Sequence, residues 1–393
     1  MKIGVLGGGS FAREFIPLFQ AHPDVSEVVL AEVMPERRQE VAAEFGLERA
    51  VASLEQLCDT DVDAIAIFTQ RWLHAPQAIT AMEAGKHVYS AVPAAVTVDE
   101  MRALVASVEA TGRTYMMGET SLYYPAAIYC RQRFAAGDFG RFVYGEGEYI
   151  HDMSHGFYDA YRHSGGDDWK RTASYPPLLY ASHSVAMVLS VTGARMTHAS
   201  GLGVHDQEGD GVFDREVSLW QNDFSNESAL FRTSDGGVCR INELRRVGVS
   251  AGSSVRLSLY GTLASFEEQS NARVWTTRET AKPVDLTDLL RCEGFEGEDP
   301  TDLRPGIDGA FYAGVSPVHD VARLPASFAG LPNAHYGSHQ FLVLDFVEAC
   351  LSGARPSVSV WDAARYCLPG IVAHESARQG GVLLTIPDLG GGA

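Results

Sequence analysis

The sequence predicts an α/β protein: an N-terminal Rossmann domain with a doubly wound parallel sheet, then a C-terminal α/β domain with a large open, mostly antiparallel sheet. A short apolar stretch that runs directly into a glycine-rich turn and a helix predicts the first domain. Short strand-like stretches separated by turn residues predict the second sheet. At roughly 100–200 residues per domain, the 393 residues divide into two domains, which we place at 1–122 and 123–393.

The composition is that of a globular enzyme. Hydrophobic residues make up 46% of the chain and charged residues 21%. No apolar run approaches the roughly 20 residues of a membrane span, and the N-terminus lacks a signal-peptide pattern, so we expect a cytoplasmic protein without a membrane partner. A net charge of −19 repels nucleic acid. The six cysteines show no CxxC pair or zinc spacing, so we expect no metal and no disulfide.

A dinucleotide-binding turn follows the first expected strand. Residues 2–6 are mostly apolar, and the next residues fit the pattern G-x-G-x-x-A before a helix expected over 13–20. In this pattern Gly7 permits the tight turn, Gly9 lets a pyrophosphate approach the backbone, and Ala12 lets helix and strand pack closely. The helix N-terminus offers free N–H groups to the phosphates. The residues assigned to this turn are Gly7, Gly9, Ser10, Phe11 and Ala12.

An acidic residue follows the second expected strand, at 27–30. Glu32 lies about 20 residues past the glycines, where a carboxylate would hold the adenosine ribose hydroxyls. A carboxylate there repels a 2′-phosphate, so we expect NAD rather than NADP as the cofactor. Arg37 and Arg38 are close enough in sequence to weaken this preference. The alternative is that Glu32 is a solvated strand end.

Strands and helices alternate through the rest of the first domain. We expect helices over 38–45, 74–84 and 97–109, and strands over 64–68, 87–89 and 115–117. Ligands of a doubly wound sheet bind at the carboxyl ends of its strands. We therefore add Thr69, His74 and Pro93, which follow two of these strands, to the cofactor site.

The second domain is expected to contain several short strands and three helices. Strands are expected over 140–150, 213–220, 227–233, 237–243, 255–260 and 264–267. Helices are expected over 183–192, 339–352 and 360–378. The stretch 155–172 is rich in Gly, Asp, Tyr and Trp and is expected to be a substrate loop. The stretch 291–334 is dense in Gly, Pro and Asp, which predicts a long irregular segment.

Six stretches in order resemble the Gfo/Idh/MocA family of NAD(P)-dependent sugar oxidoreductases. They are KIGVLGGGSFA, VDAIAIFTQRWLH, EAGKHVYSAVPAA, LSLYGTLASFE, GSHQFLVLDFVEACLSGARP and the late Trp361-Asp362. The resemblance implies a Rossmann domain followed by an α/β domain whose open sheet often mediates assembly. It therefore implies a small sugar as partner and a homodimer or homotetramer.

Two departures from the family pattern point to a side branch. The lysine of the family's GKHVxxEKP motif is absent, because this chain has Ala91-Val92-Pro93. The Asp that usually stands four residues before His183 is replaced by Leu179. The chain instead resembles the NAD-dependent glycoside hydrolase branch, such as the alpha-N-acetylgalactosaminidases or glycosidases of sulfosugars. Three short motifs carry this resemblance, at 116–119, 149–152 and 180–183.

The resemblance to this branch implies redox-assisted glycoside hydrolysis. The sugar is transiently oxidised at C3, loses its C2 proton, eliminates the aglycone, adds water and is reduced again. Such a cycle needs proton donors and acceptors near neutral pH. We assign His183 to the C3 hydroxyl proton and Tyr180 to the C2 proton. Tyr149 and His151 are assigned to the leaving group and water, and Glu119 to orientation. The alternative is that these are packed aromatic and structural polar residues.

A cationic segment suggests the kind of sugar. Family members often place Trp and Arg where this chain has Trp169, Lys170 and Arg171, and Arg binds carboxylate, sulfonate or phosphate through paired hydrogen bonds. We therefore expect an anionic sugar, a uronate or sulfosugar; the alternative is a solvated loop. His339 opens a late helix and is assigned to the substrate pocket.

Two other functions stay open. The first is an ordinary NAD-dependent sugar or inositol dehydrogenase that has moved its base elsewhere, against which the absent lysine speaks. The second is a catalytically silent sugar- or nucleotide-binding protein, against which the retained Tyr and His motifs speak.

Overall fold

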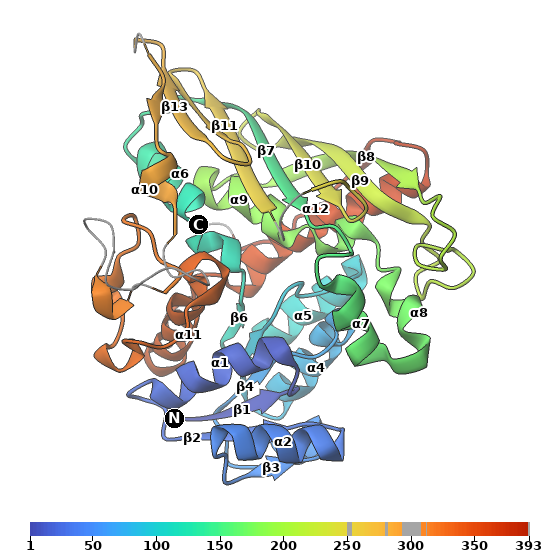
Figure 1. Ribbon diagram of the computed structural model, residues 1–393, viewed down its shortest axis with the longest axis vertical. Coiled ribbons are helices and arrows are strands. Elements are labelled where there is room, and N and C mark those ends of the chain that lie inside the picture. Colours follow the sequence, from blue (N-terminus) through green and yellow to red (C-terminus); the bar gives the residue numbers. More distant parts are fainter. Residues whose placement is uncertain (250–253, 280–281, 293–307, 312, 392–393) are drawn as a thin grey trace. The chain divides into compact units, whose positions relative to one another are not determined.

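The computed structural model describes residues 1–249, 254–279, 282–292, 308–311 and 313–391 (Figure 1). They form two compact units. The first unit contains residues 1–125, 289–364 and 389–393, and the second contains 126–288 and 365–388. The sequence-based division at 122/123 stays a prediction. The first unit ends close to it, but the described residues within 289–364, which we assigned to the second domain, belong to the first unit.

The first unit is built on a parallel six-stranded sheet among the described residues. The strands are β1 (Lys2–Leu6), β2 (Glu27–Ala31), β3 (Ala50–Val51), β4 (Ala64–Ile67), β5 (His87–Ser90) and β6 (Tyr115–Met117). Their order is β3-β2-β1-β4-β5-β6, with parallel pairing throughout. This is the doubly wound order, and the predicted Rossmann fold is confirmed.

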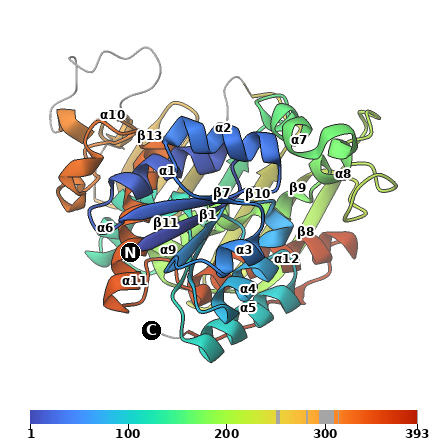
Figure 2. The same ribbon diagram turned by 90° about the horizontal axis from the view of Figure 1, so that it is seen from below.

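Helices cover both faces of this sheet. They are α1 (Ser10–Ala21), α2 (Pro35–Phe45), α3 (Leu54–Cys58), α4 (His74–Glu83), α5 (Val98–Thr111) and α11 (Ala334–Ser352). Figure 2 shows α1 and α2 on one face and α3 to α5 on the other. The α11 helix joins the core on the α1 side, because Phe341 and Phe346 are buried in one cluster with Phe15 and Phe19. Burial of these large rings holds the late helix to the first one.

The second unit contains a nine-stranded sheet, counted over the residues that the structure describes. Its strands are β7 (Phe142–Ile150), β8 (Met196–His205), β9 (Phe224–Thr233), β10 (Val238–Leu244), β11 (Ser254–Gly261), β12 (Ala264–Glu268), β13 (Arg273–Thr277), β14 (Val284–Asp285) and β15 (Leu384–Thr385). The order is β14-β13-β12-β11-β7-β10-β9-β8-β15. Only β7 and β10 pair in parallel among these described strands, so the expected mostly antiparallel sheet is confirmed.

Helices lie along one face of this sheet. The helices of the second half are α6 (Pro125–Ala135), α7 (Phe157–Gly165), α8 (Trp169–Ala173), α9 (Ser182–Thr192), α10 (Thr287–Leu290) and α12 (Val360–Arg378). Short 3-10 turns complete the chain at Arg71–Leu73, Thr120–Tyr123, Gly166–Asp168, Pro177–Tyr180, Gly309–Phe311, Val321–Arg323 and Ala326–Phe328. Figure 1 shows α9 and the end of α12 under the strands. Within the described residues, no helix has the length and apolarity that a membrane crossing requires.

Two expectations for the second half were wrong, and several elements, β8 among them, were not expected. Residues 155–172 are not a loop, since they form α7 and α8. Residues 213–220 form turns rather than a strand, because the Asp214 carboxylate accepts the Glu216 N–H and the Asp214 carbonyl accepts the Ser218 N–H. The expected irregular segment 291–334 falls partly outside the described residues, and the rest of it contains short 3-10 turns.

Glycines on β7 let α9 approach the sheet closely. A Cβ on Gly147 would lie 2.0 Å from the Ser184 carbonyl oxygen, which belongs to the backbone of α9. A Cβ on Gly145 would lie 2.9 Å from a methyl group of Val188. Gly147 therefore fixes how near the helix that carries His183 sits to the strand that carries Tyr149.

We predict that Gly147→Ala destabilises the protein by about 1–3 kcal/mol, the usual cost of overpacking against atoms that cannot move. Gly248→Ala is the control, because no described atom lies within 4 Å of a Cβ at that position. Urea unfolding of both variants measures the difference. Equal stabilities would show that α9 yields without cost and that the close approach does not constrain it.

Candidate active site

The glycine turn after β1 is open where a pyrophosphate would bind. Gly7 has φ +96°, a conformation that favours glycine, and its N–H donates to the Ala31 carbonyl at 2.8 Å. Gly9 precedes α1, and no described side chain caps the helix N-terminus. No described atom lies within 4 Å of a Cβ at Gly9. The N–H groups of Ser10 and Phe11 at this end can thus receive an anion.

Glu32 is a buried part of the turn and not a solvated strand end. Its Oε2 atom accepts the Gly8 N–H at 2.8 Å, and its Oε1 atom accepts the Met34 N–H at 2.9 Å. The Arg37 guanidinium lies 3.9 Å from Oε2, and Arg38 donates to the Glu32 main-chain carbonyl at 2.7 Å. The carboxylate therefore holds the glycine turn, and contact with the ribose stays a prediction.

His74 joins the two loops that hold the remaining predicted cofactor residues. Its Nδ1 lies 2.9 Å from the Pro93 carbonyl oxygen, and its Nε2 lies 3.0 Å from the Thr69 carbonyl oxygen. The ring is buried, and burial lowers the His74 pKa. Of these three residues, His74 has a clear structural role, because it ties the loop after β4 to the loop after β5.

Four of the five predicted catalytic residues meet in the second unit. Tyr149 lies near the end of β7, with His151 just beyond it. Tyr180 ends the 3-10 turn at 177–180, and His183 follows in α9. The Tyr149 ring centroid lies 5.5 Å from that of His183, 6.0 Å from that of Tyr180 and 5.8 Å from that of His151. The Tyr180 and His183 rings are 5.3 Å apart. Strand end, turn and helix thus deliver two phenols and two imidazoles to one place.

A buried ion pair supports this ring cluster. The Arg245 Nη2 donates to Glu243 Oε2 at 2.5 Å, and its guanidinium carbon lies 4.6 Å from the centre of the Tyr149 ring. Arg245 also donates through Nη1 to the Tyr149 carbonyl at 3.2 Å. The Ser184 hydroxyl, on α9, donates to the other Glu243 oxygen at 2.5 Å. Both charged residues are buried, so this pair carries a cation to the face of Tyr149.

The environment shifts the pKa values of two groups in opposite directions. Burial and, after it, the Arg245 charge lower the His151 pKa to about 4, so this imidazole is neutral at pH 7. Burial raises the Glu243 pKa to about 7, although Arg245 and Ser184 oppose the shift. A neutral imidazole and a cation therefore both lie close to Tyr149.

The fifth predicted catalytic residue, Glu119, belongs to the first unit. It follows β6 and is fully buried, and its Oε1 atom accepts the N–H and the hydroxyl of Ser121 at 3.1 and 2.8 Å. A Cβ on the neighbouring Gly118 would lie 1.9 Å from the Tyr89 hydroxyl oxygen. The missing side chain thus makes room for that phenol beside the Glu119 segment.

The predicted substrate segment is largely occupied by contacts within the protein. Lys170 donates to the Asp210 carbonyl at 2.6 Å, and the Trp169 ring packs against Tyr158 and under Arg162. The Arg171 side chain is exposed. His339 lies in the first unit, buried against the rings of Phe11 and Phe15.

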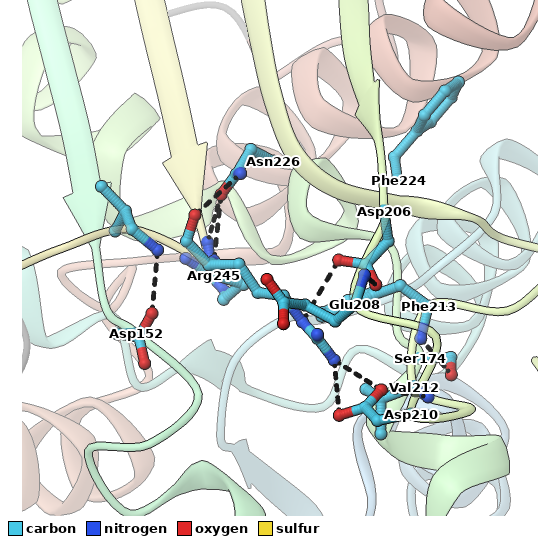
Figure 3. A network of polar contacts seen from close by, with 12 residues as sticks. Asp152, Ser174, Asp206, Glu208, Asp210, Val212, Phe213, Phe224, Asn226 and Arg245 are labelled. Atoms are coloured by element: carbon cyan, nitrogen blue, oxygen red, sulfur yellow. Dashed lines mark hydrogen bonds and ion pairs between the residues drawn. The ribbon is translucent and has the colours of Figure 1, made fainter.

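An acidic loop borders the end of β10 (Figure 3). Arg246 pairs with Asp206 at 3.2 Å and with Asp210 at 2.8 Å. The Arg245 N–H donates to the Asn226 side chain at 2.8 Å, and the Val247 N–H donates to Asp152 at 2.8 Å. These contacts fix the backbone from which Arg245 reaches toward Tyr149.

Sequence reasoning missed Glu243 and Arg245. Glu243 stands in register with Cys239 and Ile241, which face inward on β10 and are fully buried. A charged residue in the inward register of a strand was the available signal, because burial of a charge requires a partner. That this partner is Arg245, two residues away, could be learned only from the fold.

Comparisons with known proteins agree with the predicted family and fold. Residues 1–119 match the Gfo/Idh/MocA model, described as an oxidoreductase family with an NAD-binding Rossmann fold. A glycosyl hydrolase family 109 protein from Porphyromonas gingivalis is 23% identical over 406 residues, covering 99% of this chain and 84% of that protein. One from Streptomyces niveus is 26% identical over 416 residues, covering 99% and 77%. A levoglucosan dehydrogenase in complex with NADH has a TM-score of 0.75 at 19% identity, covering 99% of this chain and 100% of that chain, and so shares the fold.

We predict that Glu32 sets a preference for NADH over NADPH of at least tenfold in Kd, about 1.4 kcal/mol. In Glu32→Gln this preference shrinks about tenfold, because the carboxylate that repels a 2′-phosphate is gone while Arg37 and Arg38 remain. The measurement is titration of each cofactor by its fluorescence. Glu40→Gln, an exposed position on α2, is the control. An unchanged ratio in Glu32→Gln would limit Glu32 to a structural role in the turn.

We predict that Glu243 makes stability fall with rising pH. A carboxyl whose folded pKa of about 7 exceeds its ordinary 4.5 favours the folded state below pH 4.5, and this contribution is lost as pH rises through 7. Urea unfolding at pH 5 and pH 7.5 should show a smaller loss in Glu243→Gln than in the parent. Glu146→Gln, which breaks the pair with Arg240 on the other face of the sheet, should follow the parent. Parallel losses in all three would mean that Glu243 does not titrate in this range.

Proposed function

We propose that this NAD-dependent enzyme, whose first 119 residues form the NAD-binding Rossmann domain of the Gfo/Idh/MocA oxidoreductase family, is a glycoside hydrolase. Relatives named glycosyl hydrolase family 109 proteins cover almost the whole chain and support this proposal. The observation that carries it is the cluster of His151, Tyr180 and His183 around Tyr149, whose ring faces a buried cation.

The residues present fit NAD. The open backbone at Gly9 and the uncapped start of α1 suit a pyrophosphate, and the buried Glu32 carboxylate suits ribose hydroxyls. When bound, NAD supplies a hydride acceptor and donor for a sugar carbon. The protein must then bind the sugar, exclude water and move protons.

The ring cluster provides proton donors and acceptors of the kinds that the reaction needs. We assign His183 to the hydroxyl proton of the carbon that is oxidised and Tyr180 to the proton of the neighbouring carbon. Tyr149 donates to the departing oxygen of the aglycone, and the cation over its ring stabilises negative charge that develops on the phenol. His151, neutral at pH 7, accepts the proton of the incoming water. Glu119 orients sugar hydroxyls.

The end of β5 carries no titratable side chain to replace these residues. Ala91 is buried, and so is Val92, which stands at the lysine position of the GKHVxxEKP motif. An enzyme that only oxidised a sugar would need another base for the hydroxyl proton. In a glycosidase, the ring cluster would serve this step. It would also serve the two further proton transfers, those of elimination and of hydration.

We further propose that the sugar is anionic, a uronate or a sulfosugar. Lys170 is engaged by the Asp210 carbonyl, so the proposal depends on the exposed guanidinium of Arg171. Weaker binding of the anionic than of the neutral sugar would contradict it. The homodimeric or homotetrameric state and the cytoplasmic location expected from the sequence stay predictions.

We predict that the purified protein releases nitrophenol from a p-nitrophenyl glycoside in the presence of NAD without net accumulation of NADH. The reason is that a hydride taken from the sugar returns to it in the same cycle. The measurement follows nitrophenol and NADH absorbance together over a panel that includes uronides and sulfosugars. Stoichiometric NADH from free sugars without nitrophenol would make this chain a dehydrogenase.

Two tyrosines on the same strand give a matched control for the site. Tyr149→Phe removes a proposed proton donor and should lower kcat about 10²- to 10⁴-fold. Tyr144→Phe removes a hydroxyl that bonds Glu146 on the other face of β7 and should leave kcat within twofold. Equal rates in the two variants would remove Tyr149 from the mechanism even if the glycosidase activity is present.

A further inference from the structure

Three side chains of the first unit converge outside the cofactor turn and the ring cluster. Glu14 lies on α1, and His335 and His339 lie at the start of α11. The Glu14 Oε2 atom is 3.3 Å from His339 Nδ1 and 4.0 Å from His335 Nδ1. The three donor atoms all lie within 4.8 Å of one another, and the two imidazole rings are stacked. Two distant segments therefore bring two nitrogens and one carboxylate oxygen together.

His339 is buried and Glu14 is partly buried, and each has a buried polar atom without a hydrogen-bond partner among the described residues. The His339 side chain is 1% exposed, and its Nε2 atom has no hydrogen-bond partner among the described residues. The Glu14 Oε2 atom is buried and likewise accepts no hydrogen bond from the described residues. Polar groups buried in this way cost free energy unless a partner is present.

We propose that Glu14, His335 and His339 form a binding site for a first-row divalent metal ion of the zinc type. Two imidazoles and one carboxylate are a ligand set that Zn²⁺ and related ions take in proteins. With bonds of about 2.0–2.1 Å, the ligands of a tetrahedral ion lie about 3.3 Å apart. The Glu14 and His339 atoms already have this separation. The His335 side chain must turn from its stacked position and move closer to complete the site.

The position gives the ion both an entry path and a structural effect. The side chains of Glu14 and His335 are each 39% exposed, so an ion can arrive from solvent while His339 closes the inner side. Three protein ligands leave a fourth position for water or a small anion. The Phe11 ring, in the cofactor turn, lies 5.4 Å from both imidazole rings. A bound ion would therefore cross-link α11 to the first turns of α1, and binding to the folded state alone would raise its stability.

The test uses the full-length protein, freed of metal with a chelator, and Zn²⁺ as the probe. Isothermal titration and competition with a chromophoric chelator should give one Zn²⁺ per chain, and the thermal midpoint should rise with Zn²⁺ concentration. Co²⁺ should give the intense visible absorption of a four-coordinate ion. Glu14→Gln and His335→Gln should each weaken Zn²⁺ at least tenfold, and His198→Gln, on β8, should not.

His335→Gln keeps the test decisive even if changes at the buried His339 prevent folding, because His335 is partly exposed. Zn²⁺ bound equally well by the parent and by His335→Gln would overturn the proposal. Binding without saturation at one ion per chain, or none at all, would overturn it too. Because binding, absorption and stability are measured without substrate, the outcome does not depend on the proposed glycosidase activity.

Discussion

The candidate active site depends on the buried pair of Arg245 and Glu243. This pair links three elements, since Arg245 bonds the β7 backbone at Tyr149 and Glu243 accepts the hydroxyl of Ser184 on α9. Removing Arg245 would leave the Glu243 carboxylate buried without its cation, which costs several kcal/mol. The pair is therefore tolerated because it places a helix, a strand end and a cation around one tyrosine ring. Gly147 also contributes to this arrangement, because its missing side chain lets α9 pack close to β7.

Buried carboxylates recur as connectors in this fold. Glu32 holds the glycine turn through the Gly8 N–H, and Glu227 holds the turn that ends in Tyr180 through the Leu178 N–H. Glu227 also bonds His374 of α12 at 2.8 Å. In each case the carboxylate accepts a hydrogen bond from a backbone N–H that has no partner within a helix or sheet, because its segment is irregular. Both irregular segments, the cofactor turn and the Tyr180 turn, are thus held by side chains from neighbouring strands.

The absence of a lysine directly after β5 fits this arrangement. Apolar Ala91 and Val92 occupy that strand end, and the titratable groups are found instead on β7, the Tyr180 turn and α9. A reaction with several proton transfers needs donors and acceptors with different proton affinities. Burial shifts the pKa values of His151 and Glu243 in opposite directions, and the Arg245 charge adds to the first shift and opposes the second. The chemistry that we propose therefore depends on the different surroundings of these side chains as much as on their residue types.

The sequence by itself determined the Rossmann domain, its cofactor, and four residues that meet in one cluster, because these depend on short local patterns: a glycine turn, alternating strands and brief motifs. It did not determine that residues 155–172 are helical or that 213–220 are turns, since aromatic packing and Asp214 decide them. Only the tertiary structure brought Arg245 to Tyr149 and Glu14 to His335 and His339. The physical reason is that a buried charge is defined by its partners, and these partners lie on other strands and helices that local patterns do not place in space.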